Sequence, residues 1–126
     1  MQVKDFYYRK LKVYHQSKQL VTNIYSLTRR FPLHEQYGLS NQIQRDAISI
    51  PSNIAEGMGR FSLKERIHFL EIAYGSLMEV MCQLEIAEQL NYITSDNLTE
   101  QENLVSEIAS MLIGLRKTIE EKNNNN

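Results

Sequence analysis

The residues that could perform chemistry in this chain are few and poorly grouped. A ferritin-like metal centre needs Glu-x-x-His on two helices, and Glu65 with His68 is the single match. Cys82 has no histidine within a helical turn to activate its thiol as a nucleophile. The glycines around Met58 lack the preceding strand and the Gly-Lys-Ser/Thr ending of a phosphate loop. We therefore expect no catalytic residue, no metal site and no bound cofactor.

The basic residues are the remaining candidates, because binding an anionic partner needs no catalytic constellation. Residues 1–66 carry eleven Lys or Arg and five acids, a net charge of +6, whereas residues 67–126 carry three and ten, a net charge of -7. The candidates for nucleic-acid binding are Arg9, Lys10, Lys12, Arg60, Lys64, Arg66, Arg116 and Lys117. Tyr7 and Tyr8, beside Arg9, would offer rings to an unstacked base. In the alternative interpretation these cations pair with nearby acids and complement a helix end.

The elements that must position these cations are four helices, because apolar residues recur at spacings of three and four. We predict helices that end at Phe31, span about 40–58, begin after Ser62, and begin after a turn at 91–95. Their expected core rows are Val13, Ser17, Leu20, Ile24, Leu27 and Phe31; Ile43, Ala47, Ile50 and Ile54; Leu63, Ile67, Leu70, Tyr74, Leu77, Met81 and Leu84; and Leu98, Gln101, Val105, Ile108, Leu112, Leu115 and Ile119.

Short connections make neighbouring helices antiparallel, so an all-α, up-down-up-down four-helix bundle is expected. It forms a single domain over residues 1–122, followed by a disordered Asn tail at 123–126. In this topology the start of the chain, the connection between the second and third helices and the end of the fourth helix lie at one pole. The cations named above would therefore gather there.

A second apolar row is wider than the core of four helices requires. Its members on the first two helices are Tyr7, Tyr14, Val21, Tyr25, Ile48 and Ala55. One interpretation is a broad stripe that faces the core. The other is an interface with another subunit, because an exposed apolar patch of this length is a liability in a monomer.

Two segments carry a family resemblance. The block SIPSNIAEG at 49–57, together with AYGSLME at 73–79, resembles the four-helix-bundle proteins encoded by intervening sequences in bacterial 23S ribosomal RNA genes. The resemblance covers nearly the whole chain and implies a small bundle that assembles into a ring, a pentamer. A relative with the same fold, the accessory protein of diversity-generating retroelements, binds nucleic acid and a reverse transcriptase.

The central block also has a physical interpretation. Pro51 lies within a helix, where it removes a backbone donor and leaves the carbonyl of Ala47 unpaired, so a kink is expected. Ser49, Asn53 and Glu56 share one side of that helix and could satisfy the freed backbone or bond to the third helix. Gly57 would end the second helix, and Gly75 would admit a neighbouring backbone. A structural role for this polar motif and a ligand site are both open.

Length and composition exclude several classes of protein but indicate no activity. The chain has 126 residues, one cysteine and no apolar stretch of signal-peptide or membrane-span length, so we expect a cytoplasmic protein without a membrane partner. We expect a non-catalytic oligomeric scaffold whose basic pole binds RNA or a ribonucleoprotein. The alternative is a purely protein-binding assembly module whose acidic half meets a basic partner.

Overall fold

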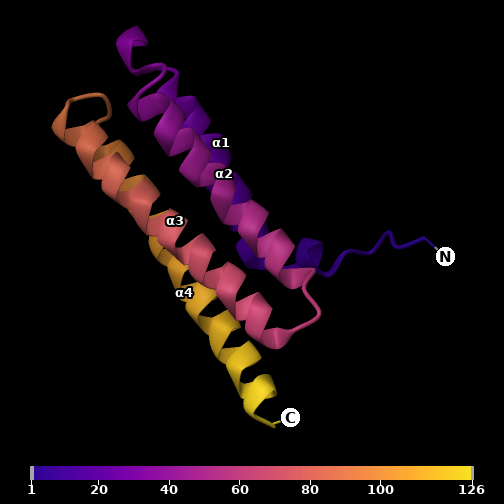
Figure 1. Cartoon of the computed structure of the whole chain (residues 1–126). Coiled ribbons are helices and arrows are strands. Elements are labelled where there is room, and N and C mark those ends of the chain that lie inside the picture. Colours follow the sequence, from indigo (N-terminus) through magenta and orange to yellow (C-terminus); the bar gives the residue numbers. More distant parts are fainter. Residues whose placement is uncertain (1, 126) are drawn as a thin grey trace.

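Helices account for nearly all of the computed structural model, which describes residues 2–125 (Figure 1). In chain order they are η1 (Tyr7–Lys10), α1 (Lys12–Thr28), η2 (Leu33–Glu35), α2 (Leu39–Met58), α3 (Leu63–Gln89) and α4 (Ser95–Asn125). Within residues 2–125 there is no strand, and the predicted all-α four-helix bundle is confirmed.

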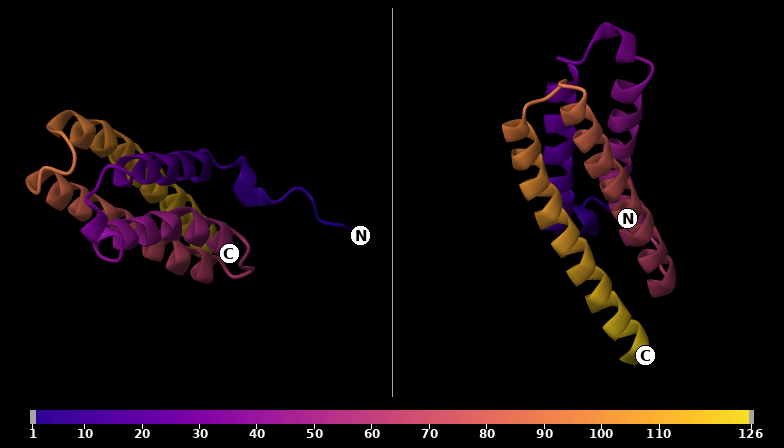
Figure 2. Two further views of the ribbon diagram at one scale, coloured as in Figure 1. Left: turned by 90° about the horizontal axis from the view of Figure 1, so that it is seen from above. Right: turned by 90° about the vertical axis from the view of Figure 1, so that its left-hand side faces the viewer.

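Each long helix packs against the next one along the chain, and α4 closes the bundle against α1. Neighbouring helices run in opposite directions, as the two views in Figure 2 show. One end of the bundle therefore holds the α1–α2 and α3–α4 connections. The other end holds η1, the α2–α3 connection and the C-terminal turns of α4, which extend past that connection. None of the helices in the described part of the chain is long and apolar enough to cross a membrane.

The core rows predicted for α1 and α2 are buried in full, including Phe31, which follows α1. In α4 the row is also confirmed, with Leu98 and Leu115 half-buried at its edges. The row predicted for α3 is incomplete: Leu70, Leu77 and Leu84 are buried and its other members pack half-buried against the core, but Ala73, Ser76 and Val80, which it omits, are buried as well. Of these residues, Ser76 faces α2, with its Oγ 2.9 Å from Ser49 Oγ.

The ends of the helices follow local chemistry. Ser62 Oγ accepts the N–H of Glu65 at 3.3 Å and caps α3, which begins after Ser62 as predicted. Thr94 and Asn97 cap the start of α4 reciprocally, each side-chain oxygen accepting the backbone N–H of the other. The end of the first helix was predicted too late: α1 stops at Thr28, and a turn then leads to Pro32.

The Asn-rich segment differs from its prediction. Helix α4 continues to Asn125, three residues into the segment expected to be disordered, and Asn126 lies outside the described residues. Extending an existing helix adds one backbone hydrogen bond per residue without a new nucleation cost. The low helix propensity of asparagine is therefore not enough to stop α4 at residue 122.

Candidate nucleic-acid interface

The three segments that carry the predicted cations lie at the same end of the bundle (Figure 1). We call this end the basic pole. It is defined by η1 with the residues before it and the first turn of α1, by the α2–α3 connection at residues 59–62 with the first turn of α3, and by the last turns of α4. Antiparallel packing brings these segments together, because each helix reverses the direction of the chain. The start of α1, the end of α2 with the start of α3, and the end of α4 therefore lie at the same end of the bundle. The topology inferred from the sequence thus places the candidate cations as expected.

At the N-terminal side of the pole, Arg9 packs against two aromatic rings. Its guanidinium lies 4.6 Å from the ring centroid of Phe6 and 5.9 Å from that of Tyr8, and Nη1 donates to the carbonyl of Lys4 at 3.3 Å. Tyr8 in turn packs edge-on against Tyr14, with ring centroids 4.8 Å apart. Tyr8 is therefore committed to intramolecular packing, whereas Tyr7 remains 48% exposed.

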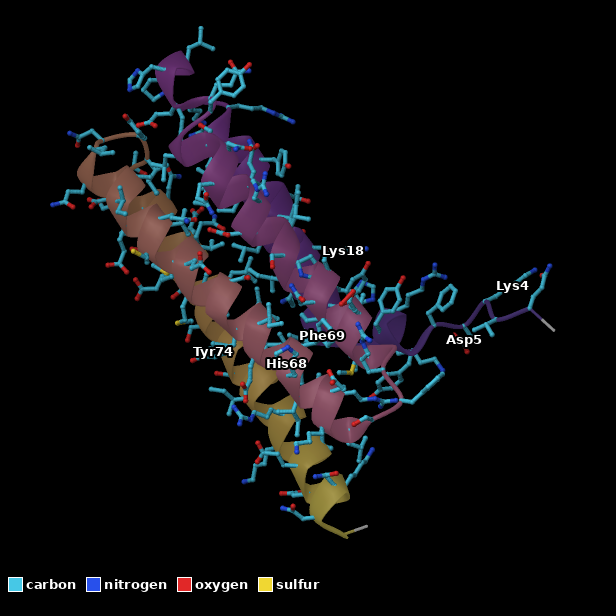
Figure 3. The ribbon with its side chains drawn as sticks, in the orientation of Figure 1. Lys4, Asp5, Lys18, His68, Phe69 and Tyr74 are labelled. Carbon is cyan, nitrogen blue, oxygen red and sulfur yellow. The ribbon has the colours of Figure 1, made fainter. Side chains whose placement is uncertain are left out.

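The lysines on this side are partly neutralised. Lys10 pairs with Asp5 at 3.2 Å, and Lys12 pairs with Glu107 of α4 at 3.6 Å. All four side chains are substantially exposed, so each pair is worth little in water and leaves its cation accessible to a competing anion. Figure 3 shows that Lys4 and Asp5 lie on the segment that extends away from the bundle.

The α2–α3 connection holds two arginines in place. Arg60 lies 4.6 Å from the ring centroid of Phe69 and pairs with Glu56 at 3.4 Å. Arg66 Nε donates to the carbonyl of Arg60 at 2.7 Å, which ties the first turn of α3 to the loop. Lys64 is exposed and has no ion-pair partner among residues 2–125. The loop therefore presents cations on a backbone that is fixed by hydrogen bonds.

The cation of α4 with the most contacts is Arg116. It pairs with Glu71 of α3 at 2.9 Å, and its Nε donates to Glu120 at 2.6 Å. The hydrogen bond to Glu120, together with the attraction of both carboxylates, raises the pKa of the guanidinium above its ordinary value. Of the α4 candidates, Lys117 is exposed and has no acidic partner within the described residues, so it is the better placed to meet a phosphate.

The polar motif of α2 is only partly as predicted. Ser49 Oγ and Ser76 Oγ are 2.9 Å apart, and the Asn53 amide donates to both the hydroxyl and the carbonyl of Ser49. This confirms a bond from the motif to α3. Glu56 is not part of it, because its carboxylate pairs with Arg60 in the exposed loop. The helix itself remains continuous through Pro51.

The close approach predicted for Gly75 is found at Gly57 instead. A Cβ at Gly57 would lie 2.8 Å from Phe69 Cβ and 3.4 Å from the carbonyl oxygen of Arg66, so α3 approaches α2 closely here. At Gly75 a Cβ would meet no atom within 4 Å, and the prediction that another backbone approaches this glycine is wrong. Figure 3 shows Phe69 on the side of α3 toward α2, and Tyr74 on the side toward α4.

The family of the chain follows from comparison with known proteins. The sequence model of the family described as 23S rRNA-intervening sequence protein matches residues 9–114. This chain belongs to that family. The match includes α1, α2, α3 and the larger part of α4, and therefore both segments of the predicted resemblance.

A solved structure of the same fold supports this assignment. It is the crystal structure, at 1.70 Å resolution, of a protein of unknown function from the S23 ribosomal protein family of Bacteroides thetaiotaomicron VPI-5482. The identity is 28%, the TM-score is 0.77, and the alignment covers 83% of this chain and 98% of that one. No curated protein matches the sequence. The comparisons thus give the intervening-sequence family and its fold.

In this member of the family, a groove of about 420 Å³ lies between α1 and α2 on the outside of the bundle. Most of the residues predicted for a subunit interface line it, namely Tyr14, Val21, Ile48 and Ala55. Lys18 lies on the same groove, with Nζ 4.9 Å from the ring centroid of Tyr14. Tyr25 lines a separate depression nearer the α1–α2 connection, and Tyr7 lies on η1 at the basic pole.

A contact at the opposite end of the bundle was not predicted. Tyr92 Oη donates to Glu35 at 2.8 Å, and the N–H of Leu39 donates to the other carboxylate oxygen at 3.2 Å. These bonds, with the attraction of His34, lower the pKa of Glu35, and the bond to Glu35 raises the pKa of Tyr92. The contact joins the α1–α2 and α3–α4 connections across 57 residues of sequence, a separation that leaves no local signal.

The remaining chemical candidates are placed as follows. His68 is exposed, one position along the chain from Ile67 of the predicted core row. Cys82 is exposed, because the face of α3 that meets the core is rotated away from it. No group of three or more His, Cys, Asp or Glu within the described residues could hold a metal ion.

Proposed function

We propose that this protein is a non-catalytic, self-assembling binding module whose basic pole contacts RNA, either alone or within a ribonucleoprotein. The observation that carries the proposal is the convergence of cations from η1, the α2–α3 connection and α4 at one end of the bundle. Phosphate neutralisation by such a surface releases counterions and provides affinity without sequence specificity. The resemblance to the accessory protein of diversity-generating retroelements, which binds nucleic acid, points the same way.

The intramolecular ion pairs at the pole are compatible with this role. Those of Lys10, Lys12 and Arg60 are made by exposed side chains, whose pairs contribute from nothing to about 1 kcal/mol. A phosphate can replace such a carboxylate at little cost. Lys64 and Lys117 have no ion-pair partner within residues 2–125, so they can bind a phosphate without first releasing a carboxylate.

Self-assembly is the second part of the proposal. The groove between α1 and α2 exposes Tyr14 and Val21 in part and Ile48 by 42%, which is costly in an isolated subunit. The opposite net charges of residues 1–66 and 67–126 favour a head-to-tail contact between copies. A ring built this way, a pentamer according to the family resemblance, would repeat the basic pole around one rim and add the fields of its subunits.

Salt dependence of binding to a labelled RNA tests the role of the pole. Replacing Arg60, Lys64 and Arg66 with Ala should weaken binding at low salt and make the slope of log K against log salt concentration shallower by up to about three. The matched control replaces Arg29, Arg30 and Arg45 with Ala, which removes the same charge away from the pole. Circular dichroism should show unchanged helix content in both variants.

The proposal fails if the wild-type protein binds no RNA at low salt, or if the two triple variants lose the same affinity. The first result would favour a purely protein-binding assembly module. A specific observation supports that second candidate: exposed apolar residues of the acidic half, such as Met78, Ile86 and Ile113, lie among the glutamates of α3 and α4. Such a surface is complementary to a basic protein and repels RNA.

A further inference from the structure

Among the described residues, Phe61 is the large apolar residue with the most exposed side chain. It lies in the α2–α3 connection, and its side chain is fully exposed. Its neighbour in the chain, Arg60, instead packs on Phe69. A phenyl ring held in water at the tip of a loop costs solvation free energy and contributes nothing to the core. The exposed ring of Phe61 is therefore a candidate for contact with another molecule.

The backbone that carries Phe61 is fixed on both sides. The N–H of Gly59 donates to the carbonyls of Ala55 and Glu56, and the N–H of Arg60 donates to the carbonyl of Gly57 at 3.0 Å. After Phe61, Ser62 caps α3 through the N–H of Glu65. The backbone that carries the ring is therefore already ordered. Stacking of a base on Phe61 then needs little additional ordering of the loop and costs little conformational entropy.

A second exposed ring lies at the same end of the molecule. Tyr7 begins η1, which contacts α2, and its side chain is 48% exposed. Cations flank both rings: Arg9 and Lys10 follow Tyr7, while Arg60 and Lys64 lie on either side of Phe61. The basic pole thus combines accessible aromatic faces with positive charge, whereas the exposed Tyr37 at the opposite end lies in a segment without Lys or Arg between Phe31 and Ile43.

We propose that the basic pole recognises unpaired nucleotides of a single-stranded RNA segment, with Phe61 as the principal stacking residue and Tyr7 as the second. Bases in a duplex already stack on their neighbours and hide their faces, so a protruding ring finds a partner only where the strand is unpaired. The flanking cations then hold the phosphates on either side of the stacked base. This inference rests on the proposed function and specifies the kind of RNA that the pole accepts.

Fluorescence tests the stacking directly, because the chain contains no tryptophan. The variant Phe61→Trp places a single indole at the loop tip, and the matched control Tyr37→Trp places one at the opposite end. A single-stranded oligoribonucleotide should quench the emission of Phe61→Trp and leave that of Tyr37→Trp unchanged. The same strand annealed to its complement should quench neither.

Affinity gives the second readout. Phe61→Ala should weaken binding of the single-stranded oligonucleotide by about tenfold, the order that one base–aromatic stack contributes. Phe61→Tyr should keep the wild-type affinity, as should Tyr37→Ala, and duplex binding should be the same in all of these variants. Sizing chromatography should show that none of the substitutions changes the assembly.

Distinct results overturn the inference. Equal affinity of Phe61→Ala and wild type for the single strand removes Phe61 from the site while leaving the proposed function intact, and so does equal quenching by single strand and duplex. A changed sizing profile for Phe61→Ala assigns the ring to a protein contact instead. Absence of any RNA binding by the wild type at low salt refutes the proposed function itself, and the inference with it.

Discussion

At the scale of single residues, Gly57 and Gly75 differ although both lie inside long helices. Gly57 is buried where α3 approaches, with Phe69 Cβ and the Arg66 carbonyl occupying the space that a Cβ would need. Gly75 is exposed and borders open space. The first glycine is therefore required by packing, whereas the second only lowers the helix propensity of α3.

This contrast predicts opposite effects of the same substitution. Gly57→Ala should destabilise the protein by about 1–3 kcal/mol, because the new methyl group forces Phe69 or the α3 backbone to move. Gly75→Ala should stabilise it by about 0.5–1 kcal/mol, because alanine favours the helix and meets no obstacle. Urea unfolding followed by circular dichroism measures both. Wild-type stability of Gly57→Ala would show that the interface between α2 and α3 yields to a methyl group.

At the scale of elements, the end of α3 depends on one residue with an unusual backbone. Asn91 has φ 65°, and the bonds that close the helix run from its N–H to the Glu88 carbonyl and from the N–H of Tyr92 to the Ala87 carbonyl. This pair of bonds is the Schellman motif, which places its left-handed residue just beyond the helix. The turn then directs the chain into α4.

Replacing Asn91 with a residue that adopts a positive φ less readily should weaken the turn. Asn91→Ala should lower the free energy of unfolding by about 1 kcal/mol, because a Cβ is strained in the left-handed region and the asparagine side chain relieves that strain locally. Asn91→Gly should not lower it, since glycine adopts this conformation freely. Chemical denaturation of the two variants decides the matter: equal losses would mean that the side chain of Asn91, rather than its backbone conformation, stabilises the turn.

The core rows of the four helices differ in how well they could be predicted from the sequence. The rows of α1, α2 and α4 were predictable, because in each helix polar residues occupy the side opposite the core row. In α3 apolar residues nearly surround the helix, Ile72 and Met78 among them, so that the period does not fix which side faces the core. Small residues such as Ala73 and Ser76 decide it through close packing, a property of helix pairs that periodicity within one helix does not reveal.

Some features of the candidate site could also be predicted from the sequence, and others could not. Cations at the basic pole could be placed from topology, since short connections fix which helix ends lie together. The exposed state of Phe61 and the packing of Tyr8 against Tyr14 could not, because both depend on how the chain folds around each ring. The same holds for the bond between Glu35 and Tyr92, which joins two connections that are distant in sequence.

At the scale of the whole molecule, the division of charge and the apolar groove bear on the same question. Within Lys12–Thr28 there is no acidic residue, so the α1 side of the groove is uniformly neutral or basic. The acids of the chain are concentrated in α3 and α4, on the other side of the bundle. A copy placed with its acidic side against this groove would gain both apolar burial and favourable electrostatics, and repetition of that contact around an axis closes a ring.

Adding positive charge inside the groove therefore tests the proposed assembly. The double variant Tyr14→Lys with Val21→Lys should shift the protein toward the monomer in sedimentation analysis, because burying two unpaired ammonium groups at an interface is costly. The control, Gln19→Lys with Ser26→Lys, adds the same charge at exposed positions of α1 outside the groove and should leave the assembly unchanged. Ile48→Lys, at a site already 42% exposed, separates loss of assembly from loss of folding. An intact assembly in the groove variants would assign these residues to the edge of the core, whereas monomers with full helix content would identify the groove as the subunit interface.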